Sequence, residues 1–396
     1  MPASPVSRSS SLLLRTLGTL GQYFEGSAAV RLAGGPGICD FLAGDPQEPA
    51  IPGLTDALVK AATPQRTDWF AYSANETEPC EIVADALRDR HGMPFEREDV
   101  FLVPGTFAGI SVSLRTLVDP GDEVIYVIPP WFVYEAMIVD VGATPVRIAV
   151  QEGTWDLDLA AIEAAIGPRT RAIIVNSPHN PTGRIHPPEI LEGLGRILAE
   201  GSRRNGRTIY LISDESYNRI LFDGRTFPTP TAYHDASVLL STYTKVLLAP
   251  GERIGYAALS PSMPLGDRKA IRMAFMINQM TSGWLFPSAL LQHAIGDLER
   301  LSIDIPALQR KRDRMAGALQ EMGYDLHVPE GTFYLFPRCP VPDDMAFARY
   351  LSDRNVFVLP GTIVEMPGWF RISLTATEDM IERSLPVFDE ALAALQ

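Results

Sequence analysis

A lysine that follows an apolar run is the residue of this sequence best placed for covalent chemistry. Lys245 comes shortly after the stretch Ser237–Leu240, with Thr242 and Thr244 before it and Arg253 after it. The lysine amine can form an imine with an aldehyde, and the two hydroxyls and the guanidinium can hold a phosphate. A surface lysine and arginine that cap a strand are the alternative for such a run. Taken with the motifs below, the run predicts a site for a phosphorylated aldehyde.

A carboxylate ends a second apolar run. Asp214 follows Tyr210–Ser213, and Tyr217 comes shortly after it. A buried acid at the end of a strand costs free energy unless it is paired with a cation. A protonated pyridine nitrogen would be such a cation, so Lys245 and Asp214 together indicate pyridoxal phosphate chemistry. In isolation, Asp214 is more simply interpreted as a helix N-cap.

A third apolar run, Ala172–Val175, leads into a segment with several prolines and a glycine, Asn176–Arg184. This composition predicts a rigid loop after a strand. Asn180 in the loop could donate a hydrogen bond to the phenolic oxygen of a pyridoxal ring, whereas an Asx-turn is the usual role of a lone asparagine. His179 beside it is interpreted first as a loop histidine.

Two further segments could complete a cofactor pocket. Val100–Val103 precedes Gly105, a pattern that predicts a strand, a glycine turn and a helix start. The first amides of such a helix point at an anion with the helix dipole behind them. These amides belong to Thr106, Phe107 and Ala108. Trp131 follows the strand-like run Glu123–Ile128, and a core tryptophan is the alternative to a role in the pocket.

The order of these motifs resembles the class I and II aminotransferases, which have the aspartate aminotransferase fold (fold type I) and use pyridoxal 5'-phosphate. The resemblance extends from about Phe41 to Gln396. It rests on Asn180-Pro181-Thr182-Gly183, Asp214-x-x-Tyr217, Thr242-x-Thr244-Lys245 with Arg253, and Phe370–Leu374. It implies a transaminase that moves the amino group of an L-amino acid to a 2-oxo acid by a ping-pong mechanism. Elimination or oxidation at the same site, and more remotely a non-catalytic ligand-sensing module, are the alternatives.

The resemblance also implies roles for single residues. Lys245 would bond the aldehyde, Asp214 would pair with the pyridine nitrogen, and Tyr217 would act with them in catalysis. The implied cofactor-binding residues are Gly105, Thr106, Phe107, Trp131, Asn180, Asp214, Tyr217, Thr242, Lys245, Arg253 and, reaching a neighbouring subunit, Tyr72. The implied substrate-binding residues are Gly44, Asn180 and Arg371, although Arg371 could instead pair with an acid such as Asp379. Some aspartate-specific members carry a cation for the distal carboxylate at the position of Phe107, so this phenylalanine disfavours a dicarboxylic substrate that is bound in that particular way. Trp284 and the loop around Trp369 are expected to help shape the side-chain pocket.

The elements that must position these residues alternate between strands and helices. The expected strands are Val100–Val103, Glu123–Ile128, Ala172–Val175, Tyr210–Ile212, Val238–Leu240 and Tyr256–Leu259, and Pro188–Glu200 is an expected helix. This pattern predicts an α/β fold whose large domain has a mostly parallel sheet, of the seven-stranded type, wrapped by helices. Chemistry is then expected at the carboxyl ends of the strands.

After Pro287 the pattern changes to that of a smaller α+β domain. We expect helix from Ser288 to Met322, short strands near Thr332–Phe336, Val356–Leu359 and Arg371–Leu374, a closing helix Glu378–Leu395 and an early strand Asp40–Leu42. The predicted division is therefore an N-terminal arm with the first part of the small domain (1–50), a large cofactor-binding domain (51–287) and a C-terminal small domain (288–396).

The composition of the chain indicates which partners it does not bind and which cellular compartment suits it. A net charge of −14 over 396 residues makes nucleic-acid binding improbable, because that affinity rests on basic patches. Cys39, Cys80 and Cys339 lack metal-site spacing and fit a reducing cytoplasmic compartment without a bound metal. No apolar run has the length of a membrane span. The segment up to Glu25 is expected to be an arm on the partner subunit of a homodimer with shared active sites, with a transit peptide as the alternative.

Overall fold

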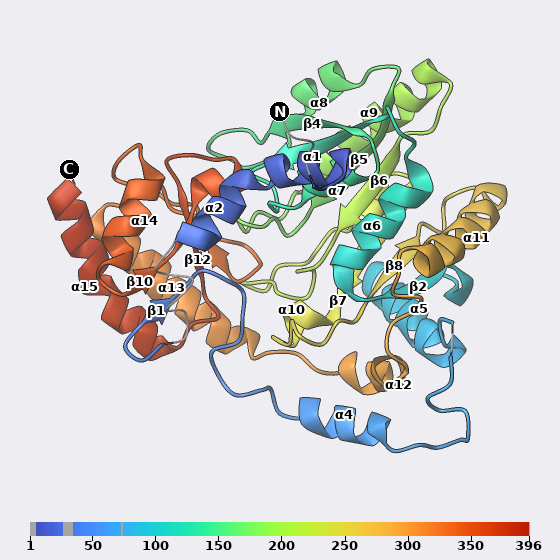
Figure 1. The fold of residues 1–396 in the computed structure, drawn as a ribbon, viewed down its shortest axis with the longest axis horizontal. Coiled ribbons are helices and arrows are strands. Elements are labelled where there is room, and N and C mark those ends of the chain that lie inside the picture. The colour runs from blue at the N-terminus through green and yellow to red at the C-terminus, as the bar shows by residue number, and fades with distance from the viewer. Residues whose placement is uncertain (1–4, 27–34, 73, 396) are drawn as a thin grey trace.

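The computed structural model describes residues 5–26, 35–72 and 74–395. Its centre is a seven-stranded sheet that separates two layers of helices (Figure 1). The strand order is β2 (Val100–Val103), β8 (Gly255–Leu259), β7 (Ser237–Thr242), β6 (Tyr210–Asp214), β5 (Thr170–Asn176), β3 (Glu123–Ile128) and β4 (Thr144–Ala149). Neighbouring strands are parallel except at β8, which runs antiparallel to both β2 and β7. The predicted α/β class with a mostly parallel sheet is confirmed.

Helices cover both faces because alternate residues of the buried strands point to opposite sides of the sheet. One face packs against α6 (Gly105–Leu117), α7 (Tyr134–Asp140) and α11 (Leu265–Thr281). The opposite face packs against α8 (Leu159–Ala165) and α9 (Pro188–Asn205). Towards β2 that face is covered by α4 (Leu54–Ala62), α5 (Thr77–His91) and α12 (Ala289–Leu298). Short helices complete this part: η1 (Arg97–Asp99), η2 (Pro230–Tyr233) and α10 (Tyr243–Val246).

The C-terminal part has its own hydrophobic core and two small sheets. Strands β11 (Leu359–Pro360), β12 (Phe370–Ser373) and β9 (Tyr334–Leu335) form an antiparallel sheet, and β1 (Cys39–Asp40) pairs in parallel with β10 (Val356–Phe357). The helices are α13 (Ile305–Met322), α14 (Asp344–Ser352), α15 (Glu378–Leu395) and η3 (Gly361–Val364). Figure 1 shows α13, α14 and α15 gathered on the side opposite to α11.

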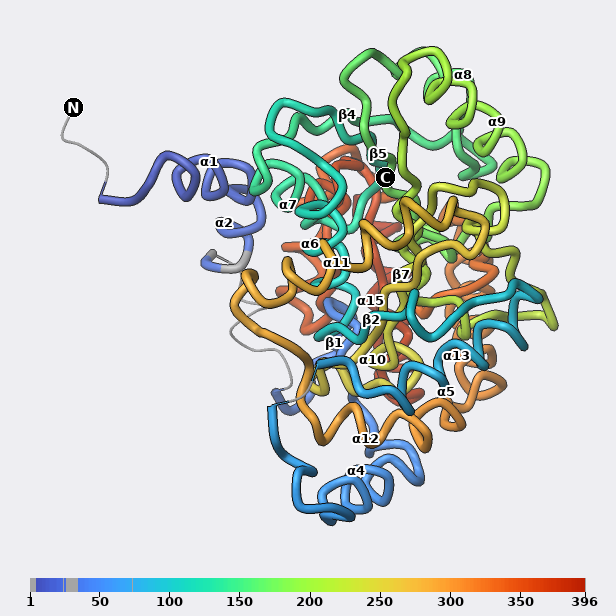
Figure 2. The backbone as a smooth tube through the Cα atoms, turned by 90° about the vertical axis from the view of Figure 1, so that its right-hand side faces the viewer, coloured from blue at the N-terminus to red at the C-terminus, as the bar shows by residue number. Residues whose placement is uncertain are grey.

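Two helices, α1 (Arg8–Thr16) and α2 (Gly18–Gly26), form the N-terminal segment, and α1, which has no buried residue, projects from the molecule (Figure 2). Helix α1 contacts α7, and Figure 2 shows the pair beside α7 and α6. The phenol of Tyr23 in α2 donates a 3.2 Å hydrogen bond to the carbonyl of Val358, which follows β10. The N-terminal segment therefore connects the large sheet with the C-terminal part.

Several details differ from the prediction, among them the expected strand Val356–Leu359, which is divided between β10 and β11 in two different sheets. Strand β4 was not predicted: it lies at an edge of the sheet, and none of its residues is fully buried. The expected helix Ser288–Met322 is divided into α12 and α13 by an extended segment that ends at the N-cap Asp304. The expected early strand Asp40–Leu42 is shorter and begins one residue earlier, and its partner is β10.

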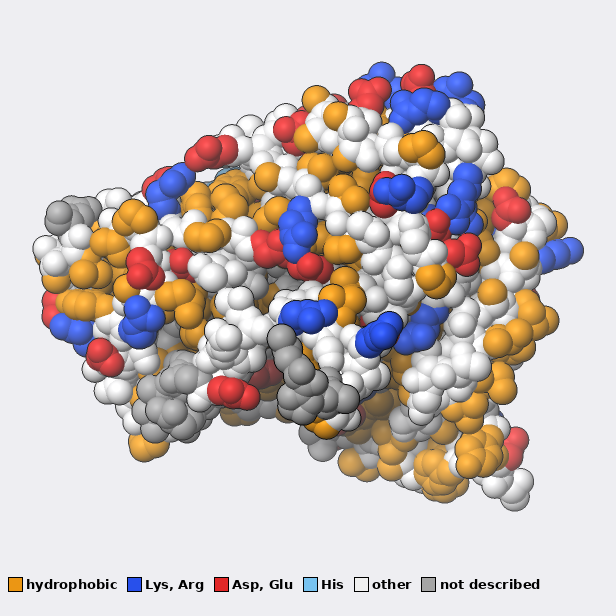
Figure 3. Space-filling model, turned by 45° about the horizontal axis from the view of Figure 1, so that its top comes forward, with side chains coloured by type: hydrophobic (Ala, Val, Ile, Leu, Met, Phe, Trp, Pro, Cys, Tyr) orange, Lys and Arg blue, Asp and Glu red, His pale blue; other side chains and the backbone are white. Residues whose placement is uncertain are grey.

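The described surface carries charges of both signs. On the face in Figure 3, Lys and Arg side chains lie between Asp and Glu side chains. No helix within residues 5–26, 35–72 and 74–395 has the length and apolar character that a bilayer crossing requires.

Candidate active site

A cavity of about 500 Å³ opens at the carboxyl ends of β5, β6 and β7. Asn176, Asp214 and Thr242 end these three strands and line it. The predicted residues that also line it are Gly44, Thr106, Phe107, Trp131, Asn180, Tyr217, Lys245, Arg253 and Arg371. Motifs that lie far apart in the sequence thus meet around one space, as the topology of a parallel sheet requires.

Lys245 lies in α10, the short helix that begins where β7 ends. Thr242 caps this helix, and its hydroxyl is 2.9 Å from that of Thr244. The ammonium of Lys245 lies 6.0 Å from the ring centre of Tyr217 and 5.9 Å from that of Phe333. Within the described residues no carboxylate forms an ion pair with it, whereas Lys60 and Lys311 each pair with an acid at 2.8 Å. Its amine therefore remains available to the cavity.

Asp214 is a buried carboxylate that accepts hydrogen bonds from neutral groups. The phenol of Tyr134 donates to it at 2.5 Å and the hydroxyl of Ser216 at 2.7 Å. Burial raises the pKa of Asp214 above the ordinary value of a carboxyl group, while the hydrogen bonds from Tyr134 and Ser216 act in the opposite direction. A buried acid held in this way favours a cation in the cavity beside it.

A phosphate-sized group would meet hydroxyls and a guanidinium at one end of the cavity. The hydroxyls of Ser216 and Thr106 lie 2.9 Å apart at the start of α6. Among the described residues, Arg253 donates only to the backbone carbonyls of Pro250 at 2.8 Å and Pro104 at 3.4 Å, and partial burial lowers its pKa. A Cβ at Gly105, whose φ is +76°, would lie 2.7 Å from an Arg253 nitrogen. Glycine is thus required for this close approach.

Arg371 reaches the cavity from β12 and contacts the loop that follows β5. Its guanidinium donates to the side-chain oxygen of Asn180 at 3.2 Å and to the carbonyl of Leu42 at 2.8 Å. The guanidinium carbon lies 4.1 Å from the ring centre of Tyr334, and the buried Nε has no hydrogen-bond partner. The alternative pairing with Asp379 is wrong, because Asp379 pairs with another arginine of α15 at 2.7 Å. A buried arginine with an unused donor suits a ligand carboxylate.

Gly44 and Tyr217 lie beside this arginine. A Cβ at Gly44 would lie 2.5 Å from the ring of Phe333 and 2.6 Å from the hydroxyl of Tyr334, so a larger residue would not fit. Tyr217 is buried, and burial together with the adjacent Tyr334 hydroxyl raises its pKa well above the ordinary phenol value. Its phenol therefore stays protonated and can act as a hydrogen-bond donor.

The aromatic residues divide into two groups. Phe107 and Trp131 line the cavity with ring centres 4.6 Å apart and nearly perpendicular planes. Trp284 lines an adjoining cavity instead. The expected contribution of Trp369 to the pocket is wrong: its ring stacks on Phe336 at 5.5 Å within the core.

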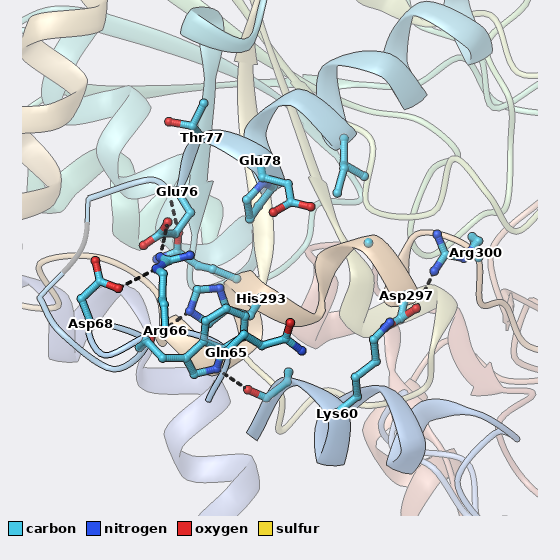
Figure 4. A pocket seen from close by; sticks show the side chains of 16 residues that line it. Lys60, Gln65, Arg66, Asp68, Glu76, Thr77, Glu78, His293, Asp297 and Arg300 are labelled. Carbon is cyan, nitrogen blue, oxygen red and sulfur yellow. Dashed lines mark hydrogen bonds and ion pairs between the residues drawn. The ribbon is translucent and has the colours of Figure 1, made fainter. Parts of the chain in front are cut away.

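Tyr72 does not reach the cavity of its own chain. Its side chain is 97% exposed. A nearby cavity of about 680 Å³ lies between α4, α5 and α12 (Figure 4). Its ion pairs are Lys60 and Arg300 with Asp297, and Arg66 with Asp68 and Glu76. Because these basic groups are already neutralised, this second cavity is a poor candidate for the chemical step.

Several residues at the site escaped sequence reasoning. Tyr134 is 80 positions from its partner Asp214. Tyr334 lies on β9 and Arg371 on β12, and the pairing of these two strands brings their side chains into contact. Ser216 and Asn176 lie next to predicted motifs, so their spacing from Asp214 and Asn180 could have indicated them. Asn176 donates to the Asp214 carbonyl at 2.9 Å and accepts from the Asn180 amide at 2.7 Å.

Comparisons with known proteins agree with this geometry. The family model "aminotransferase class I and II" matches residues 39–387. The aspartate/prephenate aminotransferase of Thermus thermophilus is 29% identical over 370 residues, covering 90% of this chain and 92% of that protein. The aspartate aminotransferase of Rhizobium meliloti is 28% identical over 406 residues, covering 96% and 94%. A solved amino transferase structure from Eubacterium rectale superposes with a TM-score of 0.88 at 27% identity and covers 100% of both chains. The resemblance seen in the sequence is therefore confirmed, and the chain belongs to the class I and II aminotransferase family.

Proposed function

We propose that the chain is a pyridoxal-phosphate-dependent aminotransferase that moves the amino group of an L-amino acid to a 2-oxo acid. One observation carries the proposal: the amine of Lys245, the carboxylate of Asp214 and the guanidinium of Arg371 line the same cavity. Bound pyridoxal phosphate supplies an aldehyde that takes up an amine and a ring that accepts the charge of a deprotonated α-carbon.

The residues of the cavity fit this cofactor. Arg253, which has no carboxylate partner in the described part of the chain, would hold the phosphate together with Thr106 and Thr242. Asp214 would keep the proton on the pyridine nitrogen. Asn180 and the protonated phenol of Tyr217 would bind the phenolic oxygen. Trp131 would pack on the cofactor, and Gly105 would leave room for Arg253 at the phosphate.

The chain's own side chains would then handle the substrate. Arg371 binds the α-carboxylate through its planar donors, which fixes the amino acid in one orientation. Lys245, once free, would take the proton from the substrate's α-carbon and return it to the aldehyde carbon of the cofactor, which becomes the carbon that carries the amino group. Gly44 leaves room for the carboxylate beside Tyr334.

Amine transfer is the direct test. Purified protein loaded with pyridoxal phosphate is given an amino acid and then, after removal of the donor, 2-oxoglutarate or pyruvate. Appearance of a new amino acid, with recovery of the aldehyde absorbance, supports transamination by alternating half-reactions. Release of ammonia or consumption of oxygen without amine transfer would instead support elimination or oxidation. Binding without any conversion would favour the ligand-sensing alternative.

A homodimer with shared active sites is part of the proposal. Tyr72 is almost fully exposed, and α11 exposes an apolar stripe spaced by three and four residues. The stripe consists of Met273, Met276, Ile277 and Met280. Contiguous apolar surface on one helix face is typical of a subunit contact, and a twofold partner would bring Tyr72 near a neighbouring site. The buried free thiols Cys39, Cys80 and Cys339 support a cytoplasmic location.

For the domain limits we propose one adjustment. Helix α12 packs against α4 and α5, in the core on the β2 side of the large sheet. We therefore assign α12 to the cofactor-binding domain 51–287 and place the start of the C-terminal small domain just before α13, while residues 1–50 keep their predicted place.

A further inference from the structure

In the proposed function, the cofactor and the α-carboxylate would engage every cation of the described cavity lining. Among the described residues that line it, the basic ones are Lys245, Arg253 and Arg371. The proposed function gives these three groups the aldehyde, the phosphate and the substrate's α-carboxylate. No cation of the described lining is then left for a second carboxylate, and the exposed Asp45 at the rim adds negative charge.

The remaining wall of the cavity is apolar. It is lined by Leu17, Leu20, Phe107, Trp131, Phe132 and Val133. Phe107 and Trp131 pack edge to face, and Trp131 and Phe132 have ring centres 6.2 Å apart. Apolar surface of this kind favours the burial of an apolar side chain, whereas a charged side chain would lose its hydration without gaining a partner.

Two of these residues come from the N-terminal helices. Leu17 caps the end of α1 and Leu20 lies in α2, and both are half-buried, whereas Leu14 on the same segment is 66% exposed. In Figure 2, α1 projects from one side of the molecule, with its C-terminal end and α2 next to α7. Leu17 and Leu20 of this segment therefore face the cavity, whereas Leu14 faces solvent.

The apolar space continues beyond this wall. An adjoining cavity of about 690 Å³ shares Leu17, Phe107 and Arg253 with the first and is also lined by Leu13 and Trp284. A long aliphatic or aromatic side chain would therefore find room between the N-terminal helices and α6, on the side of Phe107.

We propose that the amino-acid substrate has an uncharged, apolar side chain, and that Leu17 and Leu20 select it together with Phe107. The inference rests on the proposed function, and it separates this chain from the relatives whose names specify aspartate. In this arrangement the N-terminal helices supply part of the specificity pocket.

The test uses one half-reaction, so that the choice of acceptor does not matter. The cofactor-loaded, full-length enzyme is mixed with leucine, methionine, phenylalanine, alanine, aspartate or glutamate, and conversion of the pyridoxal to the pyridoxamine form is followed by absorbance. We expect the second-order rate constants for leucine, methionine and phenylalanine to exceed those for the two dicarboxylic acids by more than about tenfold.

Variants assign the selection to the named residues. Leu17→Ala and Leu20→Ala should each lower the rate constant for leucine and phenylalanine by about tenfold while changing that for alanine little. Leu14→Ala is the matched control on the solvent side and should leave all donors unchanged. Phe107→Lys should raise the rate constant for aspartate relative to that for leucine.

The outcomes distinguish a failure of the substrate assignment from a failure of the proposed aminotransferase function. A wild-type preference for aspartate or glutamate would overturn the inference and leave the aminotransferase function standing. Equal losses for alanine and leucine in the Leu17 and Leu20 variants would show that these residues only seal the cavity. Failure to convert any amino acid would overturn the proposed function and this inference with it.

Discussion

Tyr134 and Asp214 form a 2.5 Å hydrogen bond between the first residue of α7 and the last residue of β6. Both groups are buried, and burial raises the pKa of each. The phenol is the donor, because its own pKa lies well above the ordinary value and it stays protonated. The bond therefore favours the charged form of Asp214, the form that would pair with a pyridinium.

Tyr134→Phe tests this relationship through pH. Without the phenol, the pKa of Asp214 rises further, because the removed bond favours the carboxylate. Activity needs the carboxylate, so it is lost as pH falls through this pKa, and the acidic limb of the pH–rate profile should move to higher pH. At acidic pH the half-reaction should slow by about tenfold or more, as for a lost hydrogen bond to a charged group.

The control for this variant is Tyr126→Phe. Tyr126 is also a buried tyrosine that donates to a carboxylate, that of Glu365 at 2.9 Å, but it does not line the cavity. Its pH–rate profile should match the wild type. Identical profiles for the Tyr134 and Tyr126 variants would show that the bond to Asp214 is structural only.

Lys245→Ala should abolish turnover and covalent attachment of the cofactor. Borohydride reduction of the loaded wild type, followed by peptide mapping, should place the label on Lys245. The other lysines of the chain are Lys60, Lys269 and Lys311. Lys269→Ala is a suitable control, because that exposed side chain lies on α11, outside the cavity lining. A label on any lysine other than Lys245 would refute the assignment.

Arg371→Lys should weaken the transition state for α-amino acids by about 1.5 to 3 kcal/mol, since one amine cannot replace the planar pair of donors. Simple amines without a carboxylate should lose far less. The measurement compares kcat/KM for both kinds of donor. If amino acids and amines lose activity equally, the contacts of Arg371 with Asn180 and Leu42 serve the fold alone.

Complementation tests the shared active site. Tyr72→Asp and Lys245→Ala are each expected to be inactive, and mixed dimers should regain one site built from the intact Lys245 of one subunit and the intact Tyr72 of the other. Activity is measured after subunit exchange, and exchange itself is followed with differently tagged chains. Proven exchange without recovered activity, or a monomer active at low concentration, would argue against shared sites.

The buried strands were predictable because their residues form continuous apolar runs. Strands β2 and β3 have the predicted limits, and β5, β6 and β7 extend only one or two residues beyond them at either end. Strand β4 has no such run, because Pro145 and Arg147 interrupt it and it pairs with a single neighbour. Strand β4 lacks the two-sided burial from which the others were recognised, whereas β2, at the opposite edge of the sheet, is fully buried.

The site residues that could be predicted are those that follow a predictable strand. Lys245, Asp214 and Asn180 follow strands that the sequence predicts, so topology alone brings them together. Tyr134 and Tyr334 contribute through contacts between distant segments, and no local pattern distinguishes them from core tyrosines. Leu17 and Leu20 belong to helices whose position against the cavity is a property of tertiary packing.

One closed loop carries both proposed anchors of the cofactor. The base of the loop is fixed where β7 and β8 pair, with Thr242 opposite Gly255 and the Thr242 hydroxyl donating to the Ile254 carbonyl at 2.9 Å. Lys245 and Arg253 lie on the two arms above this base. The spacing between the covalent and the ionic anchor is therefore set by the length of a single antiparallel connection. A residue inserted between Lys245 and Arg253 would leave the register of β7 and β8 intact but change the distance between the two anchors. A hinge motion of the C-terminal part would not change that distance.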